Sequence, residues 1–283
     1  IVGMIFQTRS NTITGKDTNH MSQSSFGNKF KVTTWGESHG KALGAVIDGC
    51  PAGLPLCEED IQKFLDRRKP GQSRYTTARK EGDLVEILSG VFEGKTTGTP
   101  ISLMVRNTDQ RSRDYGNIAY SYRPGHADYT FDQKYGFRDY RGGGRSSGRE
   151  TIGRVAAGAI ASKILEELGI SICTYTRSIG PVEIASFNKE EIHQNAFYMP
   201  DAQAAVKAGE YLEECMKNQD SAGGVIECRI TGTPAGLGEP VFDKLSALLA
   251  HALMSIGAVK AVEIGDGIAV TSSNGSTDND GFT

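Results

Sequence analysis

The residues best suited to bind an anion lie in a glycine-rich run, RGGGRSSGRET, at positions 141–151. Ser147 and Glu150 have the S-x-x-E spacing of a capping box, which predicts that the run opens into a helix. A helix N-terminus presents unpaired backbone N–H groups and the positive end of the helix dipole. Three arginines lie among these donors: Arg141, Arg145 and Arg149. The pattern favours a site for a phosphate or carboxylate over a plain flexible loop before a capped helix.

A hydroxyl and an imidazole stand side by side, as Ser38 and His39, in the turn GESHG at positions 36–40. This turn matches the G-x-S-x-G nucleophile elbow of serine hydrolases, but that elbow needs a helix directly after the serine. Residues 41–48 form instead a β-like apolar run that includes Gly44, which disfavours a hydrolase. What remains is an exposed turn whose histidine could protonate a leaving group near neutral pH. The alternative is a structural histidine satisfied by the backbone.

A second histidine, His126, lies in the rigid turn RPGHAD at positions 123–128. The neighbouring Arg123 and Asp128 could orient its ring and shift its pKa. Taken alone, this histidine is equally consistent with a structural role. The remaining histidines lack such a setting and are expected to be structural: His20, His193 and His251.

From Arg67 to Lys80 the chain carries six basic residues and no acidic one. The first of them end an expected helix, where the helix dipole favours cations even without a ligand. The functional alternative is recognition of a multiply charged anion, because the planar guanidinium of arginine makes bidentate contacts.

The overall charge sets limits on partners. The chain has 31 basic and 34 acidic residues, a net charge of −3, so neither a nucleic acid nor a membrane partner is expected. The five cysteines form no C-x-x-C pair, so no metal site is expected and a reduced, cytoplasmic setting fits best. No apolar run approaches the roughly 20 residues that span a bilayer.

Hydrophobic periodicity predicts one continuous α+β domain over residues 21–283, after an unstructured extension at 1–20 with Met21 as a natural start. Strands are expected at 31–35, 43–46, 84–92, 101–107, 170–175, 225–231 and 259–264. Helices are expected at 58–69, 149–168, 201–217 and 242–256. Residues 108–148 show little periodicity and are expected to form a long functional loop.

Five motifs together are more specific than any one of them. They are GESHG at 36–40, DRRKPGQSRYTT at 66–77, RPGHAD at 123–128, YRGGGRSSGRET at 140–151 and PAGLGEPVFDKL at 234–245. In this order and spacing the chain resembles the chorismate synthase family, from about Met21 to its last residue. Motifs this long and numerous make a chance match very improbable.

The resemblance implies a carbon–oxygen lyase of the shikimate pathway of aromatic amino-acid biosynthesis. Such an enzyme loses phosphate from 5-enolpyruvylshikimate 3-phosphate by anti-1,4-elimination to give chorismate. The family needs reduced FMN without net redox change, and NADPH is the possible reductant. The implied fold is a β-α-β sandwich with helices between antiparallel sheets, assembled as a homotetramer.

The resemblance also assigns roles to individual positions. His39, with Ser38 beside it, corresponds to the histidine that protonates the departing phosphate, and His126 to the one that protonates reduced flavin. Flavin contacts fall on Arg145, Ser146, Ser147, Gly257 and Ala258, where Gly257 replaces a common asparagine and can act only through its backbone. Ser147 is also a catalytic candidate. Arg149 matches a substrate-binding arginine, and Arg68 and Arg74 match contacts to substrate or nicotinamide nucleotide.

One departure from the family pattern bears on activity. Relatives continue with a Gly-rich loop, a second flavin loop and a motif that supplies a catalytic aspartate, and none of these is found in this sequence. The chain is therefore interpreted as C-terminally truncated and is expected to be inactive by itself. The sequence also speaks against two other function classes. A phosphotransferase is disfavoured because no G-K-[ST] follows the glycines, and an RNA-binding module because of the net charge.

Overall fold

The computed structural model describes residues 23–71, 75, 81–108, 119–279 and 281, and all structural statements concern these residues. Its largest sheet has five antiparallel strands in the order β1-β2-β3-β7-β4. Their bounds are β1 Ser25–Phe26, β2 Lys31–Gly36, β3 Ala42–Asp48, β7 Ile101–Arg106 and β4 Val85–Ile87. A separate small hairpin pairs β5 Val91–Phe92 with β6 Lys95–Thr96.

The two central strands of this sheet bury one face by simple alternation. In β7, Ile101, Leu103 and Val105 are buried, and every second residue of β3 does the same from Leu43 onward. Since side chains of a strand point alternately to opposite faces, this period of two directs the apolar set to a single side. That side forms the main hydrophobic core.

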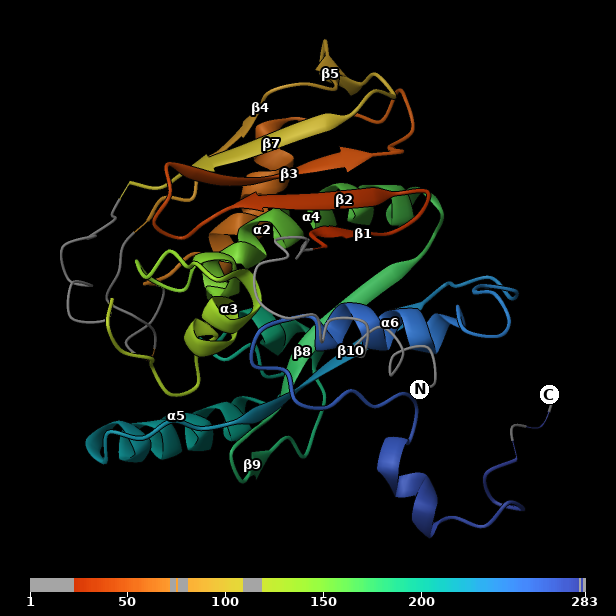
Figure 1. Ribbon diagram of the computed structural model, residues 1–283. Helices are drawn as coiled ribbons and strands as arrows, with labels where there is room; N and C mark the ends of the chain where they lie inside the picture. The colour runs from red at the N-terminus through yellow and green to blue at the C-terminus, as the bar shows by residue number, and fades with distance from the viewer. Residues whose placement is uncertain (1–22, 72–74, 76–80, 109–118, 280, 282–283) are drawn as a thin grey trace.

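Helices α2 (Glu58–Arg68) and α4 (Thr151–Glu167) cover this apolar face and pack against each other (Figure 1). Small residues set how closely α4 approaches the sheet. A Cβ atom at Gly153 would lie 2.9 Å from both the Gly44 carbonyl oxygen and the Thr34 methyl group. The first turns of α4 are thereby held directly against β2 and β3, close to the turn that joins these two strands.

A second sheet has the order β10-β8-β9 and is also antiparallel. Its strands are β8 Ser171–Ile179, β9 Val182–Glu183 and β10 Gly224–Thr231; α5 (Ala202–Lys217) packs against β9, and α6 (Leu245–Met254) follows β10. Figure 1 shows α2 and α4 between the five-stranded sheet and this one. The predicted β-α-β sandwich, with helices between antiparallel sheets, is therefore confirmed.

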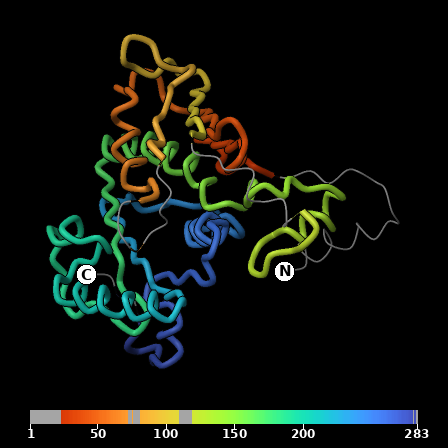
Figure 2. The backbone as a smooth tube through the Cα atoms, turned by 90° about the vertical axis from the view of Figure 1, so that its left-hand side faces the viewer, coloured from red at the N-terminus to blue at the C-terminus, as the bar shows by residue number. Residues whose placement is uncertain are grey.

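Three expected elements differ from the structure. The strand at 259–264 is wrong, since these residues form no strand. The single strand at 84–92 is divided into β4 and β5 by a turn in which Gly90 has φ +81°. The loop at 108–148 contains the helix α3 (Asp128–Tyr135), which has only one buried residue and hence no apolar stripe to reveal it. Figure 2 shows the segment around α3 extending away from the sheets.

Short 3-10 helices complete the chain: η2 Gly144–Ser146, η3 Gly148–Glu150, η4 Lys189–His193 and η5 Gly267–Ser272. The first two occupy the glycine-rich run and lead into α4, so the predicted helix at 149–168 is confirmed with its first regular turn at Thr151. The expected extension at 1–20 lies outside the described residues.

Asp201 offers a test of how the second sheet is held to α5. Its Oδ1 accepts hydrogen bonds from the backbone N–H groups of Gln203 and Ala204 at the helix start, and its Oδ2 from those of Ala185 and Ser186. These bonds favour the carboxylate and lower the pKa of Asp201 from 3.8 to about 2. We expect Asp201→Ala to lower the free energy of unfolding by ~1–2 kcal/mol at pH 7, the usual cost of losing such a cap.

The effect of Asp201→Ala on the free energy of unfolding should become smaller as the pH falls. A depressed carboxyl pKa stabilises the fold above the unfolded-state value, and this stabilisation is lost as the pH falls from near 3.8 toward about 2. Urea titrations at pH 7 and at low pH should therefore show the gap between wild type and Asp201→Ala closing under acid conditions. The control is Asn188→Ala at the neutral cap of η4, whose effect should not change with pH. A constant gap for Asp201→Ala would contradict the assignment.

Candidate active site

The turn between β2 and β3 carries Ser38 and His39 into the interior. Ser38 is 1% exposed and His39 is 7% exposed, so the sequence-based expectation of an exposed turn is wrong. The Ser38 hydroxyl lies 3.1 Å from His39 Nδ1, within hydrogen-bonding distance. Strand β3 follows the turn directly, and the missing helix removes the nucleophile-elbow interpretation.

Gly142 covers the His39 ring, which explains part of this burial. It has φ +66°, and a Cβ atom there would lie 2.2 Å from His39 Nδ1 and 3.0 Å from the Ser38 hydroxyl. Only a glycine permits this approach of the two chain segments. Nearby Asp139 has a lowered pKa because it accepts hydrogen bonds from Arg141, with a smaller attraction from His39.

The RPGHAD turn braces Gly142 from the other side. Arg123 makes a bidentate contact with Asp128 at 2.9 Å and also donates to the Gly142 carbonyl at 2.8 Å. Arg123, with a further contribution from Arg138, lowers the pKa of Asp128 to about 2. His126 in the same turn is exposed, and its Nδ1 lies 3.1 Å from the Pro124 carbonyl. The two candidate histidines are thus joined through the Gly142 segment.

Arg149 is buried in a cluster of acceptors. Its guanidinium lies 3.0 Å from Asp83 Oδ1 and 3.2 Å from Glu81 Oε2, and it donates twice to Asn107 Oδ1. Both carboxylates have fully buried side chains, and that of Arg149 is 6% exposed. The contact between Nη1 and Asp83 does not have hydrogen-bond geometry. Nη1 is buried, and no other described residue accepts a hydrogen bond from it.

Arg68, at the end of α2, shares one of these carboxylates. Its Nη1 lies 2.6 Å from Asp83 Oδ2, and its Nε donates to the Thr151 hydroxyl at the start of α4. Burial lowers the pKa of Arg68, and the attraction of Asp83 opposes that shift. The cluster therefore balances two guanidinium groups against two carboxylates, so these two arginines bring no local surplus of positive charge.

Arg145 holds the glycine-rich loop against β2. It donates to the Gly36 carbonyl at 3.0 Å and to the Thr34 hydroxyl at 2.6 Å. The Thr34 hydroxyl in turn donates to Glu150 Oε1 at 3.1 Å. These contacts fix the position of the loop relative to the Ser38–His39 turn.

The serines of the loop also contact the backbone. Ser146 donates to the Gly143 carbonyl at 2.7 Å, and Ser147 Oγ accepts from the backbone N–H of Arg149 at 3.3 Å. The predicted capping box is thus wrong in detail. The Ser147 side chain caps the short turn η3, while the Glu150 side chain bonds to β2 rather than to the Ser147 backbone.

The turn with Gly257 and Ala258 lies near the start of α4. Arg154 of α4 donates to the hydroxyl and the carbonyl of Ser255 at 2.6 and 3.2 Å. Gly257 and Ala258 are exposed, and Ala258 has φ +71°. Helix α4 thus lies between two segments that are predicted to contact the flavin: 145–147 precedes it in the chain, and 257–258 follows Ser255, which Arg154 of this helix contacts. Arg74 lies outside the described residues.

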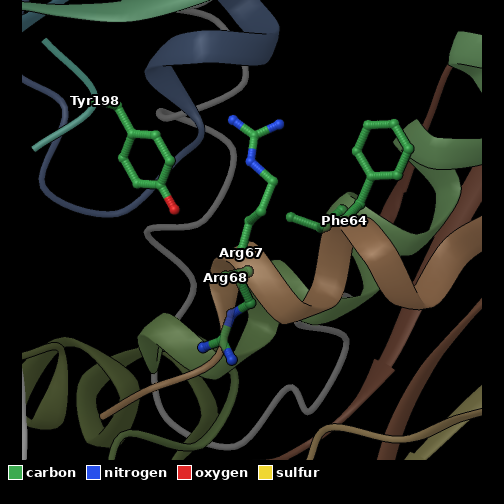
Figure 3. A pocket seen from close by; sticks show the side chains of 5 residues that line it. Phe64, Arg67, Arg68 and Tyr198 are labelled. Carbon is green, nitrogen blue, oxygen red and sulfur yellow. The ribbon is translucent and has the colours of Figure 1, made fainter. Parts of the chain in front are cut away.

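An open cavity of about 250 Å³ lies beside the cluster and is lined by Phe64, Arg67, Arg68, Val155 and Tyr198. The Arg67 guanidinium lies 5.3 Å from the centre of the Tyr198 ring. Figure 3 shows Arg67 pointing toward Tyr198 and Arg68 pointing the opposite way. The two neighbouring arginines therefore have different partners: Arg67 lies against Tyr198, and Arg68 pairs with Asp83.

Four residues of this site were missed by the sequence interpretation: Glu81, Asp83, Asn107 and Gly142. The first two follow the basic stretch directly, and an acidic pair after such a stretch was the available signal. Nothing in the sequence alone singles out one asparagine or one glycine of a run.

Comparison with known proteins identifies the family of this chain. The family model for chorismate synthase matches residues 30–283. The chain belongs to the chorismate synthase family. The chorismate synthase of Agathobacter rectalis is 69% identical over 264 residues, which are 93% of this chain and 72% of that protein. That of Lachnoclostridium phytofermentans is 67% identical over the same shares. A crystal structure of a chorismate synthase has a TM-score of 0.72 at 33% identity, covering 88% of this chain and 73% of the other.

Chorismate synthases are carbon–oxygen lyases of the shikimate pathway. They convert 5-enolpyruvylshikimate 3-phosphate into chorismate by anti-1,4-elimination of phosphate, and the family requires a reduced flavin; the predicted function and enzyme class are confirmed. No helix among the described ranges combines the length and apolar character needed to cross a bilayer.

Proposed function

We propose that the elimination takes place over the Ser38–His39 turn, with His39 as the acid for the departing phosphate. The supporting observation is that one loop serves both parts of the site: Gly142 closes over His39, and Arg149 of the same loop enters the Asp83 cluster. The carbon–oxygen bond breaks with its electron pair leaving on phosphate, and the ring hydrogen leaves as a proton, so that the electron pair of the broken carbon–hydrogen bond completes the new double-bond system. A proton held on His39 neutralises the developing phosphate charge.

In this proposal Arg149 and Arg68 bind the anionic groups of the substrate, a phosphate and two carboxylates. Support for the role of Arg149 comes from its place on the loop that also brings Gly142 over His39, with its guanidinium held by Asp83 and Asn107. Arg68 is 18% exposed at its side chain and can reach a ligand while bonded to Asp83.

The exposed hydroxyl and main-chain groups of the segments 145–147 and 257–258 are suited to bind reduced FMN. Ser146 is exposed, Gly257 and Ala258 offer exposed backbone, and Arg145 keeps the loop in place. When bound, the reduced flavin supplies transient electron density for loss of phosphate without net redox change. His126, exposed on its turn, is the proposed proton donor toward that group, and Ser147 is a candidate through its hydroxyl. We also propose NADPH as the reductant, with Arg68 and Arg74 as its contacts.

The proposal includes a homotetrameric assembly and a location in the cytoplasm. Large apolar side chains are exposed on the second sheet and after it, including Val225, Ile226 and Phe242, which supports burial against other subunits of a homotetramer. All five cysteines are free, which supports the reducing cytoplasm as the location.

The direct test is product formation under anaerobic conditions. We define the family-length enzyme as this chain continued by the part of the Agathobacter rectalis relative that it does not match. With reduced FMN and 5-enolpyruvylshikimate 3-phosphate, this enzyme should release chorismate and phosphate in equal amounts. The absence of chorismate from this enzyme under these conditions would contradict the proposal.

Substrate binding gives a second, residue-level test. Arg149→Lys keeps the charge but removes the fork that faces Asp83 and Asn107. We expect the Kd for the substrate, measured by calorimetry, to rise about 10-fold, which is about 1.4 kcal/mol. Arg141→Lys in the same loop is the control, since the ion pair of Arg141 within the described part of the chain is with the exposed Asp139. An unchanged Kd for Arg149→Lys would remove this residue from the binding site.

A further inference from the structure

Asn107 joins the two halves of the proposed site. It follows β7 directly, and its side-chain amide lies between the Ser38–His39 turn and Arg149. Nδ2 donates to the carbonyl oxygens of Glu37 and Gly40, the two residues that flank the Ser38–His39 pair, at 3.0 and 2.8 Å. Oδ1 accepts from Nε and Nη2 of Arg149 at 3.2 and 2.9 Å.

The chemistry of the partners fixes the direction of this amide. A guanidinium has only donors, so the oxygen of Asn107 must face Arg149. Backbone carbonyls only accept, so the NH₂ group must face Glu37 and Gly40. Reversal of the amide would oppose donor to donor and acceptor to acceptor at four contacts. The backbone N–H of Asn107 also donates to the Lys41 carbonyl at 3.1 Å, which ties its main chain to the same turn.

We propose that Asn107 is a positioning residue that sets the spacing between the His39 turn and Arg149. The inference rests on the proposed function, in which His39 donates the proton and Arg149 binds the substrate. A rigid link matters there, because the anion held by the arginine must present its leaving phosphate to the histidine. Displacement of a reacting group by as little as ~1 Å can cost about 10²-fold in rate.

The two ends of the amide can be tested separately. Asn107→Asp keeps an acceptor for Arg149 but turns an oxygen toward the carbonyls of Glu37 and Gly40. We expect kcat of the family-length enzyme, measured at saturating substrate, to fall about 10-fold or more; the added negative charge beside Arg149 raises the substrate Kd as well. Asn107→Leu removes donors and acceptor alike, so kcat should fall and the Kd should also rise about 10-fold.

Asn195 provides a matched control outside the site. Its Nδ2 donates to the carbonyls of Glu191 and Met199, and its Oδ1 accepts from the N–H groups of Phe197 and Met199. Asn195→Asp should therefore lower thermal stability as Asn107→Asp does, yet leave kcat unchanged. The proposal is overturned if both asparagine-to-aspartate variants lose only stability, or if Asn107→Leu retains the normal kcat and Kd. A normal turnover of His39→Asn would instead overturn the proposed function itself.

Discussion

Replacing His39 by asparagine is expected to lower kcat of the family-length enzyme about 10²- to 10⁴-fold, the usual contribution of a positioned general acid. The side chain is buried beside Ser38, and its Nδ1 lies 3.1 Å from that hydroxyl, so the imidazole is held in one place within the proposed site. Asparagine keeps a polar group in this space but cannot hold a transferable proton at neutral pH. Anaerobic stopped-flow measurement of chorismate formation at saturating substrate would report the change.

Substrate binding separates this role from a structural one. Since Arg149 and Arg68 supply the anion contacts in the proposal, the substrate Kd of His39→Asn should stay within about 3-fold of wild type. His193→Asn is the control, because His193 is exposed in η4, away from the proposed site, with its ring against that of Tyr198. If His39→Asn keeps normal turnover, or loses turnover only in proportion to unfolded protein, His39 is structural.

Much of the scaffold was accessible from the sequence because its signals are local. The period of two in β3 and β7 and the apolar stripe of α2 each depend on neighbours a few residues away. The strand expected at 259–264 failed because an apolar run needs a partner strand, and none pairs with it among the described residues. Helix α3 could not be predicted, because its residues are mostly exposed and therefore show no apolar periodicity.

The site itself was predictable only in outline. Motifs identified His39, His126 and Arg149 as candidates, and the structure connects their segments through Gly142 and Asn107. What the sequence could not show is the state of each arginine, since that depends on acids far along the chain. Arg149 is paired with carboxylates 66 and 68 positions earlier, at Asp83 and Glu81, and a charge count along the chain does not reveal such partners.

Gly142→Ala should lower turnover nearly as much as His39→Asn, although residue 142 has no side chain to contribute. The added Cβ would lie 2.2 Å from His39 Nδ1 and 2.4 Å from Cε1, closer than any real contact of this kind. Either the loop or the imidazole must move. Arg123 holds the Gly142 carbonyl at 2.8 Å, and Arg145 fixes the same loop to β2, so we expect the imidazole to be displaced. The expected loss is about 10²-fold or more, measured by the same stopped-flow assay.

Backbone strain must be separated from this displacement, and Gly136→Ala does so. Gly136 has φ +69°, almost the same as Gly142, but a Cβ there has no heavy atom within 4 Å. Both substitutions should cost about 1 kcal/mol of stability through the left-handed backbone, whereas only Gly142→Ala should slow turnover. A double variant completes the argument. If Gly142→Ala acts through His39, adding it to His39→Asn should lower turnover little further, because the group it displaces is already gone. Fully additive losses would mean that Gly142 acts on another part of the site.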